Sequence, residues 1–280
     1  MKTGLVLEGG GKRGIYTAGV LDIFMEQGIS FDGVIGVSAG AIHGCSFVAE
    51  QIGRSIRYNL EYGNDYRFMS LRSWLLTGNI VDVKFCYHDL PEKLDPFDNQ
   101  AFESSATKFY VVCSNVETGK PEYIQCHNMT SEIDFLRASA SLPVVSRIVK
   151  VGEKKLLDGG ICDSIPVQAF MNMGYDKNVV ILTRPRGYRK RPARLQWLTK
   201  FVYRKYPNFV NAVLNRHEMY NHELDEIERL EKEGKIFVLR PSEKINISKM
   251  EADLNVVKDM YNLGRRDAQS ALTQIKAFLA

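Results

Sequence analysis

The stretch Gly36-Val37-Ser38-Ala39-Gly40 decides the fold of this chain. The serine follows an apolar run that starts at Gly33, and small residues come after it. This is the G-x-S-x-G pattern, in which a tight turn from a strand into a helix lifts the serine hydroxyl toward a cleft. Side chains two positions before and after the serine would collide in such a turn, so glycine is suited to both places. The pattern predicts a nucleophilic serine at position 38 in an α/β fold.

A glycine-rich loop lies upstream of this turn. An apolar strand, predicted over residues 4–8, leads into Gly9-Gly10-Gly11-Lys12-Arg13-Gly14, and a helix that ends at Gly28 follows. Glycines bring backbone N–H groups close to a ligand, and N–H groups at a helix N-terminus bind negative charge. The loop fits an oxyanion hole for acyl transfer. It also fits the phosphate loop of a dinucleotide-binding fold, because its glycines match G-x-G-x-x-G.

The dinucleotide interpretation requires an acidic residue at the end of the second strand, where it would hold a ribose hydroxyl. Asp32 lies at a suitable distance from the loop but precedes the second strand, Gly33 to Val37. The residue that closes that strand is Ser38, a nucleophile in place of a carboxylate. A nicotinamide- or flavin-dependent oxidoreductase is therefore disfavoured, and we expect no cofactor and no metal.

A lone Asp158-Gly159-Gly160 follows a predicted strand further along the chain. By itself this is an ordinary turn sequence. A serine hydroxyl, however, needs a base to take its proton, and the usual base is histidine. None of the five histidines has a suitable place in the sequence: they are His43, His88, His127, His217 and His222. We expect His43 to point away from Ser38 along the helix, and a carboxylate acting directly on Ser38 is the most economical arrangement.

With these blocks in this order, the chain resembles the patatin-like phospholipase family. The resemblance spans roughly residues 4–185 and includes a further block, Ala140-Ser141-Leu142-Pro143, between the serine and the acid. It implies hydrolysis of acyl esters in lipids by a dyad, with Ser38 as nucleophile and Asp158 as base. It also implies that residues 9–14 form the oxyanion hole. Gly160 is a small departure, because many plant members carry alanine there.

Arg13 stands on the first turn of the predicted helix, where the helix dipole disfavours a cation. We expect it to clamp the glycine loop rather than to act on the substrate directly.

Alternating strands and helices predict a three-layer patatin-like α/β fold, with a mainly parallel central sheet and helices on both faces. We expect a catalytic core at residues 1–185. A mostly helical C-terminal extension, residues 186–280, would pack on this core as part of one structural unit. Within it, residues 235–240 predict a strand, and apolar spacing on either side of Gly264 predicts two helices.

Residues 184–205 are strongly basic. They contain no acid and nine cations, which leaves the rest of the chain net negative: Arg184, Arg186, Arg189, Lys190, Arg191, Arg194, Lys200, Arg204 and Lys205. Interleaved aromatics such as Trp197 and Phe201 are typical of membrane-surface segments, which anionic headgroups attract. A nucleic-acid-binding segment and a solvated helix face with Leu195, Leu198 and Val202 inward are the alternatives. Since a lipid hydrolase must meet an interface, we expect an anionic membrane surface as partner and no nucleic acid.

Composition agrees with an enzyme, since 45% hydrophobic and 25% charged residues in 280 are ordinary for a globular chain. The chain begins Met1-Lys2-Thr3 without a signal-peptide pattern, and its longest uncharged run, residues 33–49, is short for a membrane span. Five scattered cysteines predict reduced thiols: Cys45, Cys86, Cys113, Cys126 and Cys162. We expect a cytoplasmic protein that associates peripherally with the inner membrane face. A catalytically silent lipid-binding protein and an acyltransferase remain alternatives.

Overall fold

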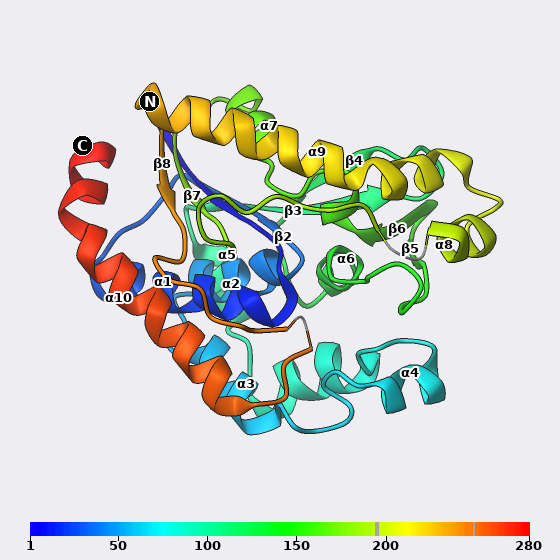
Figure 1. The fold of residues 1–280 in the computed structure, drawn as a ribbon. Helices are drawn as coiled ribbons and strands as arrows, with labels where there is room; N and C mark the ends of the chain where they lie inside the picture. Colours follow the sequence, from blue (N-terminus) through cyan, green and yellow to red (C-terminus); the bar gives the residue numbers. More distant parts are fainter. Residues whose placement is uncertain (194–195, 249) are drawn as a thin grey trace.

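An eight-stranded sheet forms the centre of the molecule in a computed structural model that describes residues 1–193, 196–248 and 250–280 (Figure 1). Its strands are β1 Lys2–Leu7, β2 Gly33–Val37, β3 Lys108–Asn115, β4 Pro121–Cys126, β5 Val149–Val151, β6 Lys154–Asp158, β7 Tyr175–Ile181 and β8 Ile236–Leu239. The order is β5-β6-β3-β2-β1-β7-β8, and β4 pairs with β3 off this path. The β3-β2-β1-β7-β8 part is parallel, whereas β4, β5 and β6 join by antiparallel pairing. The predicted mainly parallel sheet is confirmed.

Helices cover both faces of this sheet. They are α1 Ile15–Glu26, α2 Ala39–Val48, α3 Arg54–Tyr62, α4 Leu71–Thr77, α5 Asn99–Ser104, α6 Ile133–Ser139, α7 Val167–Asn172, α8 Gln196–Val202, α9 Pro207–Lys232 and α10 Leu254–Leu279. Short 3-10 turns, η1 Gly11–Gly14 and η3 Gly159–Ile161, and a π-helical segment, η2 Phe85–Leu94, complete the order. Figure 1 shows α7 and α9 on one side of the sheet and α1, α2 and α10 on the other. This is the three-layer arrangement that the sequence predicts.

The parallel strands are apolar on both faces because helices bury both faces. Leu5 and Leu7 belong to the apolar cluster shared with α1 and α10, whereas Val6 between them belongs to the cluster shared with α9. Neighbouring strand residues point to opposite faces, so one short strand contributes to two cores. Burial of each such aliphatic side chain contributes about 1.5–3 kcal/mol.

The prediction of two C-terminal helices separated at Gly264 is wrong, because α10 runs without a break from Leu254 to Leu279. Gly264 lies where α10 contacts α1. A Cβ at this position would lie 2.1 Å from the Tyr16 carbonyl oxygen of α1. Gly19 of α1 is its counterpart, with a Cβ position 2.1 Å from the Tyr261 carbonyl oxygen. The two glycines let α1 and α10 approach closely, so the helix continues through a residue that usually weakens helices.

The C-terminal part also contributes to the sheet. Strand β8 pairs in parallel with β7, with Asn178 opposite Ile236 and Ile181 opposite Leu239. On the other side, the Tyr261 hydroxyl of α10 donates a hydrogen bond of 2.6 Å to Asp22 of α1. Residues far apart in the sequence thus share the same layers. Throughout the described ranges, no helix combines the length and the apolar character that crossing a bilayer requires.

Candidate active site

Ser38 occupies the turn between β2 and α2 with φ 54° and ψ −122°. A positive φ is uncommon outside glycine and marks a locally strained backbone. The flanking glycines make the turn possible. A Cβ at Gly36 would lie 2.5 Å from Ala41 Cα, and one at Gly40 would lie 2.5 Å from the Leu7 carbonyl oxygen. The predicted nucleophile elbow is therefore present as a backbone geometry.

Ser139, which sequence reasoning missed, anchors this turn. The Ser38 N–H donates to Ser139 Oγ at 2.8 Å, and the Ser139 hydroxyl donates to the Val112 carbonyl at 2.6 Å. Ser139 is the last residue of α6 and directly precedes the Ala140–Pro143 block. The position of Ser139 next to that block is the one feature of the sequence that points to it. Serine is common at helix ends, so this feature alone does not predict that Ser139 anchors the turn.

The glycine loop lies against the elbow. A Cβ at Gly9 would approach Ser38 Cβ to 3.1 Å, and a Cβ at Gly14 would approach Ala39 Cβ to 2.6 Å. Gly11 has φ 58°, a conformation suited to glycine. Among the residues that the structure describes, the N–H groups of Gly10 and Gly11 make no hydrogen bond. These groups remain available to an anion beside Ser38.

Asp158 ends β6, which pairs with β3, and β3 pairs with β2, so the sheet brings Asp158 and Ser38 to one edge. The Asp158 side chain is 3% exposed, and its Oδ1 accepts a hydrogen bond of 2.8 Å from the Gly160 N–H. Its own N–H donates to the Ser141 carbonyl at 2.8 Å, which joins the third and fourth sequence blocks. Gly159 is required here, since a Cβ would lie 2.1 Å from the Val112 carbonyl oxygen.

Ser38 and Asp158 line one cavity of about 230 Å³, together with residues 8–13 of the glycine loop. In the described part of the chain, no hydrogen bond joins the Ser38 hydroxyl to the Asp158 carboxylate. Catalytic hydrogen bonds are often long before substrate binds and tighten afterwards.

Lys12 and His43 form a buried polar wall of the cavity. Lys12 Nζ donates to Asn59 Oδ1 at 2.9 Å, and burial lowers the pKa of Lys12 to about 8. His43 Nδ1 lies 3.0 Å from Ser55 Oγ. Burial, followed by the positive charges of Lys12 and Arg54, lowers the pKa of His43 to about 3, so the ring is neutral. His43 thus faces the cavity, but its Nδ1 partners are the hydroxyls of Ser55 and, at 3.5 Å, Tyr58, and no described hydrogen bond joins it to Ser38.

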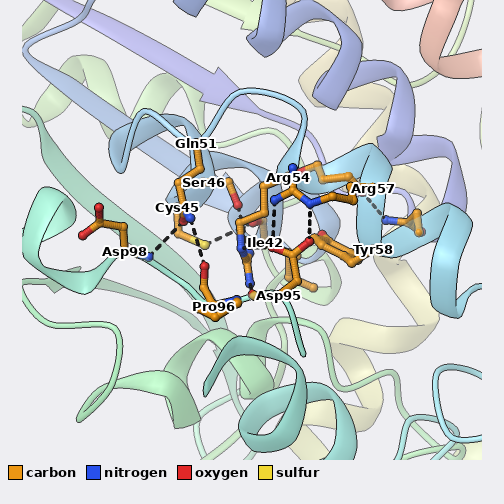
Figure 2. A network of polar contacts seen from close by, with 12 residues as sticks. Ile42, Cys45, Ser46, Gln51, Arg54, Arg57, Tyr58, Asp95, Pro96 and Asp98 are labelled. Atoms are coloured by element: carbon orange, nitrogen blue, oxygen red, sulfur yellow. Dashed lines mark hydrogen bonds and ion pairs between the residues drawn. The ribbon is translucent and has the colours of Figure 1, made fainter. Parts of the chain in front are cut away.

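Residues 55–105, which show no clean periodicity, build a second wall, held by the network in Figure 2. The buried Arg54 donates through Nη2 to the Asp95 carbonyl oxygen at 2.9 Å. Arg57 binds the Asp95 carboxylate with two hydrogen bonds, of 2.7 and 2.9 Å. Gln51 continues the network by donating to the Pro96 carbonyl at 3.0 Å. This network ties α3 to the segment before α5, and Arg54 lines the cavity.

The third wall comes from residues beyond the predicted blocks, and sequence reasoning missed it. Its members are Arg184, Tyr188, Lys190, Arg216, Tyr220 and Met250. Arg216 of α9 donates through Nε to the Gly160 carbonyl oxygen. The Tyr220 hydroxyl donates to Glu8 Oε1 at 2.6 Å, which links α9 to the start of the glycine loop. No local pattern in the sequence connects α9 with residues 8 or 160.

The basic segment 184–205 divides into two parts, and its residues Arg194 and Leu195 lie outside the described residues. In the first part, Arg186 pairs with Glu231 at 3.0 Å and Arg189 pairs with Asp225 at 2.5 Å, both acids of α9. In the second part, α8 exposes Trp197 and Phe201, which are 66% and 63% exposed. Val202 is 47% exposed, so the interpretation that places it inward is wrong.

The described residues contain no group of three or more histidine, cysteine, aspartate or glutamate side chains arranged to hold a metal ion. The site consists of a strained serine at a strand-to-helix turn, a glycine loop and a buried Asp-Gly-Gly turn at one edge of a mainly parallel sheet. Fold and site define the class of α/β proteins with a serine at a tight turn between a strand and a helix.

Within that class, the chain belongs to the patatin-like phospholipase family, whose model matches residues 5–171. A second model, described as a domain of unknown function (DUF6363), matches residues 206–280. The chain is 28% identical over 268 residues to the Escherichia coli (strain K12) protein "Uncharacterized protein YjjU", covering 93% of this chain and 74% of that protein.

It is 29% identical over 178 residues to "Lysophospholipase nte1" of Aspergillus terreus, covering 62% of this chain and 11% of that protein. The chain therefore spans only a small part of this fungal relative. A crystal structure of VipD from Legionella pneumophila aligns with a TM-score of 0.42 and 13% identity, covering 96% of this chain and 67% of that one.

Proposed function

We propose that this chain is a serine acyl hydrolase that cleaves lipid esters, as a phospholipase A, a lysophospholipase or a lipid acyl esterase. Membership of the patatin-like phospholipase family and similarity to lysophospholipases support lipid acyl hydrolysis as the class of activity. The observation that carries the proposal is the meeting of Ser38, in its strained turn, with the buried Asp158 in one cavity.

In the proposed reaction, Ser38 Oγ attacks the ester carbonyl while the Asp158 carboxylate takes the hydroxyl proton. The oxyanion that forms accepts hydrogen bonds from the glycine loop, residues 9–14, where the N–H groups of Gly10 and Gly11 are available. Collapse of this intermediate breaks the bond to the alcohol, which takes the proton from Asp158. Water then attacks the acyl carbon while Asp158 takes its proton, the bond from that carbon to Ser38 Oγ breaks, and Ser38 Oγ takes the proton back from Asp158 as the fatty acid leaves.

Lys12 and Arg13, which belong to the same loop, would hold positive charge beside the oxyanion and keep the loop in place. His43 has no part in this scheme, because its Nδ1 lies 3.0 Å from Ser55 Oγ and no described hydrogen bond joins its ring to Ser38.

We infer that the enzyme meets its lipid at the face that carries α4 and α8. Both helices expose apolar side chains: Leu71, Leu75 and Leu76 in α4 and Trp197 and Phe201 in α8. Both are also attached to one loop. The Ile80 N–H, just after α4, donates to the Val145 carbonyl at 2.8 Å, and the Val144 N–H donates to the Tyr203 hydroxyl, just after α8, at 2.9 Å. Figure 1 shows the two helices at the same edge of the molecule.

Exposed cations beside these apolar residues would attract anionic headgroups. Within residues 184–205, three exposed cations lie in or just after α8, Lys200, Arg204 and Lys205, whereas Arg186 and Arg189 pair with acids of α9. We propose peripheral association with the inner face of the membrane from the cytoplasm, where the free cysteines would stay reduced. Residues 1–185 and 186–280 are proposed as one structural unit, which the pairing of β8 with β7 supports.

A serine-directed organophosphonate and the variant Ser38→Ala test the proposed function. The wild type should hydrolyse a short-chain ester and a lysophospholipid and should carry the adduct on the Ser38 peptide. Ser38→Ala should fold normally and lose both activities, while the exposed control Ser30→Ala keeps them. An adduct at another residue, or an active Ser38→Ala, would refute the mechanism. A wild type that binds lipid without labelling would point to a silent lipid-binding protein.

A further inference from the structure

The cavity carries an excess of positive charge. Of the described residues that line it, six are cationic, Lys12, Arg13, Arg54, Arg184, Lys190 and Arg216, and three are acidic, Glu8, Glu92 and Asp158. One of the cations, Arg54, pairs with Asp95 outside the cavity, a carboxylate that it shares with Arg57. The net charge that the remaining cations give to the cavity depends on whether the acids of the cavity form salt bridges with them.

The acids have other partners. Glu8 accepts hydrogen bonds from the Tyr220 hydroxyl at 2.6 Å and from the Thr183 N–H at 2.5 Å. Asp158 accepts from Gly160, and Glu92 lies 3.1 Å from His88. Within the described ranges, no salt bridge reaches Arg13, Arg184 or Arg216.

Arg13 shows this imbalance most clearly. It is 8% exposed, lines the cavity, and its Nε has no hydrogen-bond partner in the described structure. Burial, and then the nearby charge of Arg184, lowers the pKa of Arg13. The positive charges of Arg13 and Arg184 therefore oppose each other at the cavity wall, and the negative charge of Glu8 offsets part of this effect. A buried donor without a partner is costly, and an anion between these groups would remove both penalties.

Arg216 extends this cationic wall to the catalytic turn. Its Nε donates to the Gly160 carbonyl, and a Cβ at Gly160 would lie 3.0 Å from its Nη2. The absence of a side chain at Gly160 thus makes room for the guanidinium beside Asp158. Arg184 and Arg216 both lie beyond residues 5–171, the part that matches the patatin-like family.

We propose that Arg184 and Arg216, with Arg13 behind them, form a subsite for the phosphate group of a phosphate-bearing acyl ester. Guanidinium groups bind phosphate oxygens in pairs, and a terminal phosphate offers three such oxygens and up to two negative charges. Arg216 lies in the C-terminal region that matches a domain of unknown function, so that region contributes to the subsite, whereas Arg184 precedes it. This inference rests on the proposed acyl hydrolase function.

The test compares two substrates that differ only in the phosphate, a short-chain monoacylglycerol and its 3-phosphate. Both are used below the concentration at which they aggregate, so that binding to a lipid surface does not contribute. The wild type should favour the phosphate-bearing ester in kcat/KM. Arg184→Gln and Arg216→Gln should each lower that preference about ten- to a hundredfold, the range for losing a hydrogen bond to a charged group. Arg191→Gln, an exposed arginine of the same segment, should keep the preference.

Inorganic phosphate distinguishes a lipid headgroup from a free ion as the source of the anion. If the variants keep the preference, but inorganic phosphate inhibits monoacylglycerol hydrolysis by wild type and not by the variants, the subsite holds a free phosphate ion. If neither the preference nor the inhibition changes in the variants, there is no subsite.

Direct binding separates this inference from the proposed function. The catalytically inactive Ser38→Ala protein is titrated calorimetrically with the monoacylglycerol 3-phosphate. If wild type hydrolyses neither ester, yet Ser38→Ala binds the phosphate-bearing ester and loses that binding with Arg184→Gln added, the subsite stands and the hydrolase proposal fails. If wild type hydrolyses both esters but binding does not depend on the phosphate, the hydrolase proposal stands and the subsite proposal fails.

Discussion

Replacing Asp158 and His43, one at a time, separates a dyad from a triad. Asp158→Asn keeps the shape of the side chain, and the amide oxygen can still accept the Gly160 N–H at the 2.8 Å position. The change therefore removes the base while leaving the turn intact. Loss of a general base costs about 10²–10⁴-fold in rate, or about 2.7–5.5 kcal/mol in activation free energy.

His43→Asn should change stability rather than rate. The imidazole is buried and lies 3.0 Å from Ser55 Oγ, so an imperfect replacement weakens a buried hydrogen bond and costs about 1–3 kcal/mol in unfolding free energy. Activity should stay close to that of the wild type, because His43 makes no described contact with Ser38 or Asp158.

The assay is steady-state hydrolysis of a soluble short-chain ester, combined with urea unfolding of each variant. A folded His43→Asn protein as inactive as Ser38→Ala would refute the dyad. So would an Asp158→Asn protein that retains most of its turnover.

Three further predictions follow from the same structure. Gly10→Ala places a Cβ 2.9 Å from Thr183 Oγ1 and should disturb the loop, lowering kcat about 10²–10³-fold with little change in KM; a change confined to KM would argue against an oxyanion hole. The pKa of His43, lowered to about 3 from 6.5, means that the unfolded chain binds a proton that the folded chain excludes. Stability from this group is therefore complete above pH 6.5 and is lost as the pH falls toward 3, by at most about 1.4 kcal/mol per pH unit, and urea unfolding of His43→Asn should show a flatter pH dependence than the wild type. Leu75→Gln with Leu76→Gln should weaken sedimentation with phosphatidylglycerol vesicles while soluble-ester hydrolysis persists, and equal sedimentation would exclude α4 from the lipid-facing surface.

The features that the sequence predicts correctly are those with local causes. Gly36 and Gly40 are needed because atoms within a few residues, or in the adjoining strand, occupy the space of a side chain. The strand Gly33–Val37 and the elbow after it follow from that requirement and from an unbroken apolar run. The mainly parallel sheet with helices on both faces also follows, since strands that alternate with helices favour parallel pairing.

Features that depend on distant partners could not be predicted in this way. Gly264 reads as a helix end, because glycine destabilises helices, and only the approach of Tyr16 from α1 shows why it lies inside one. Arg216 lies in a polar stretch of predicted helix, and nothing in the neighbouring sequence indicates a partner for it. Only the fold brings it to the carbonyl of Gly160. In both cases the deciding contact joins residues from opposite parts of the chain.

The basic segment 184–205 shows that the number of cations in a sequence does not tell where their charges lie in the folded protein. Nine cations without an acid suggest one uniform surface, but Glu231 and Asp225 of α9 neutralise Arg186 and Arg189. Arg184 instead lines the cavity, and the exposed Lys200, Arg204 and Lys205 lie in or just after α8, the helix that exposes Trp197 and Phe201. These two groups of cations lie in different surroundings, the first in the cavity wall and the second on the exposed surface. We therefore assign the start of the segment to the phosphate of a single substrate molecule and its end to the lipid surface from which that molecule comes.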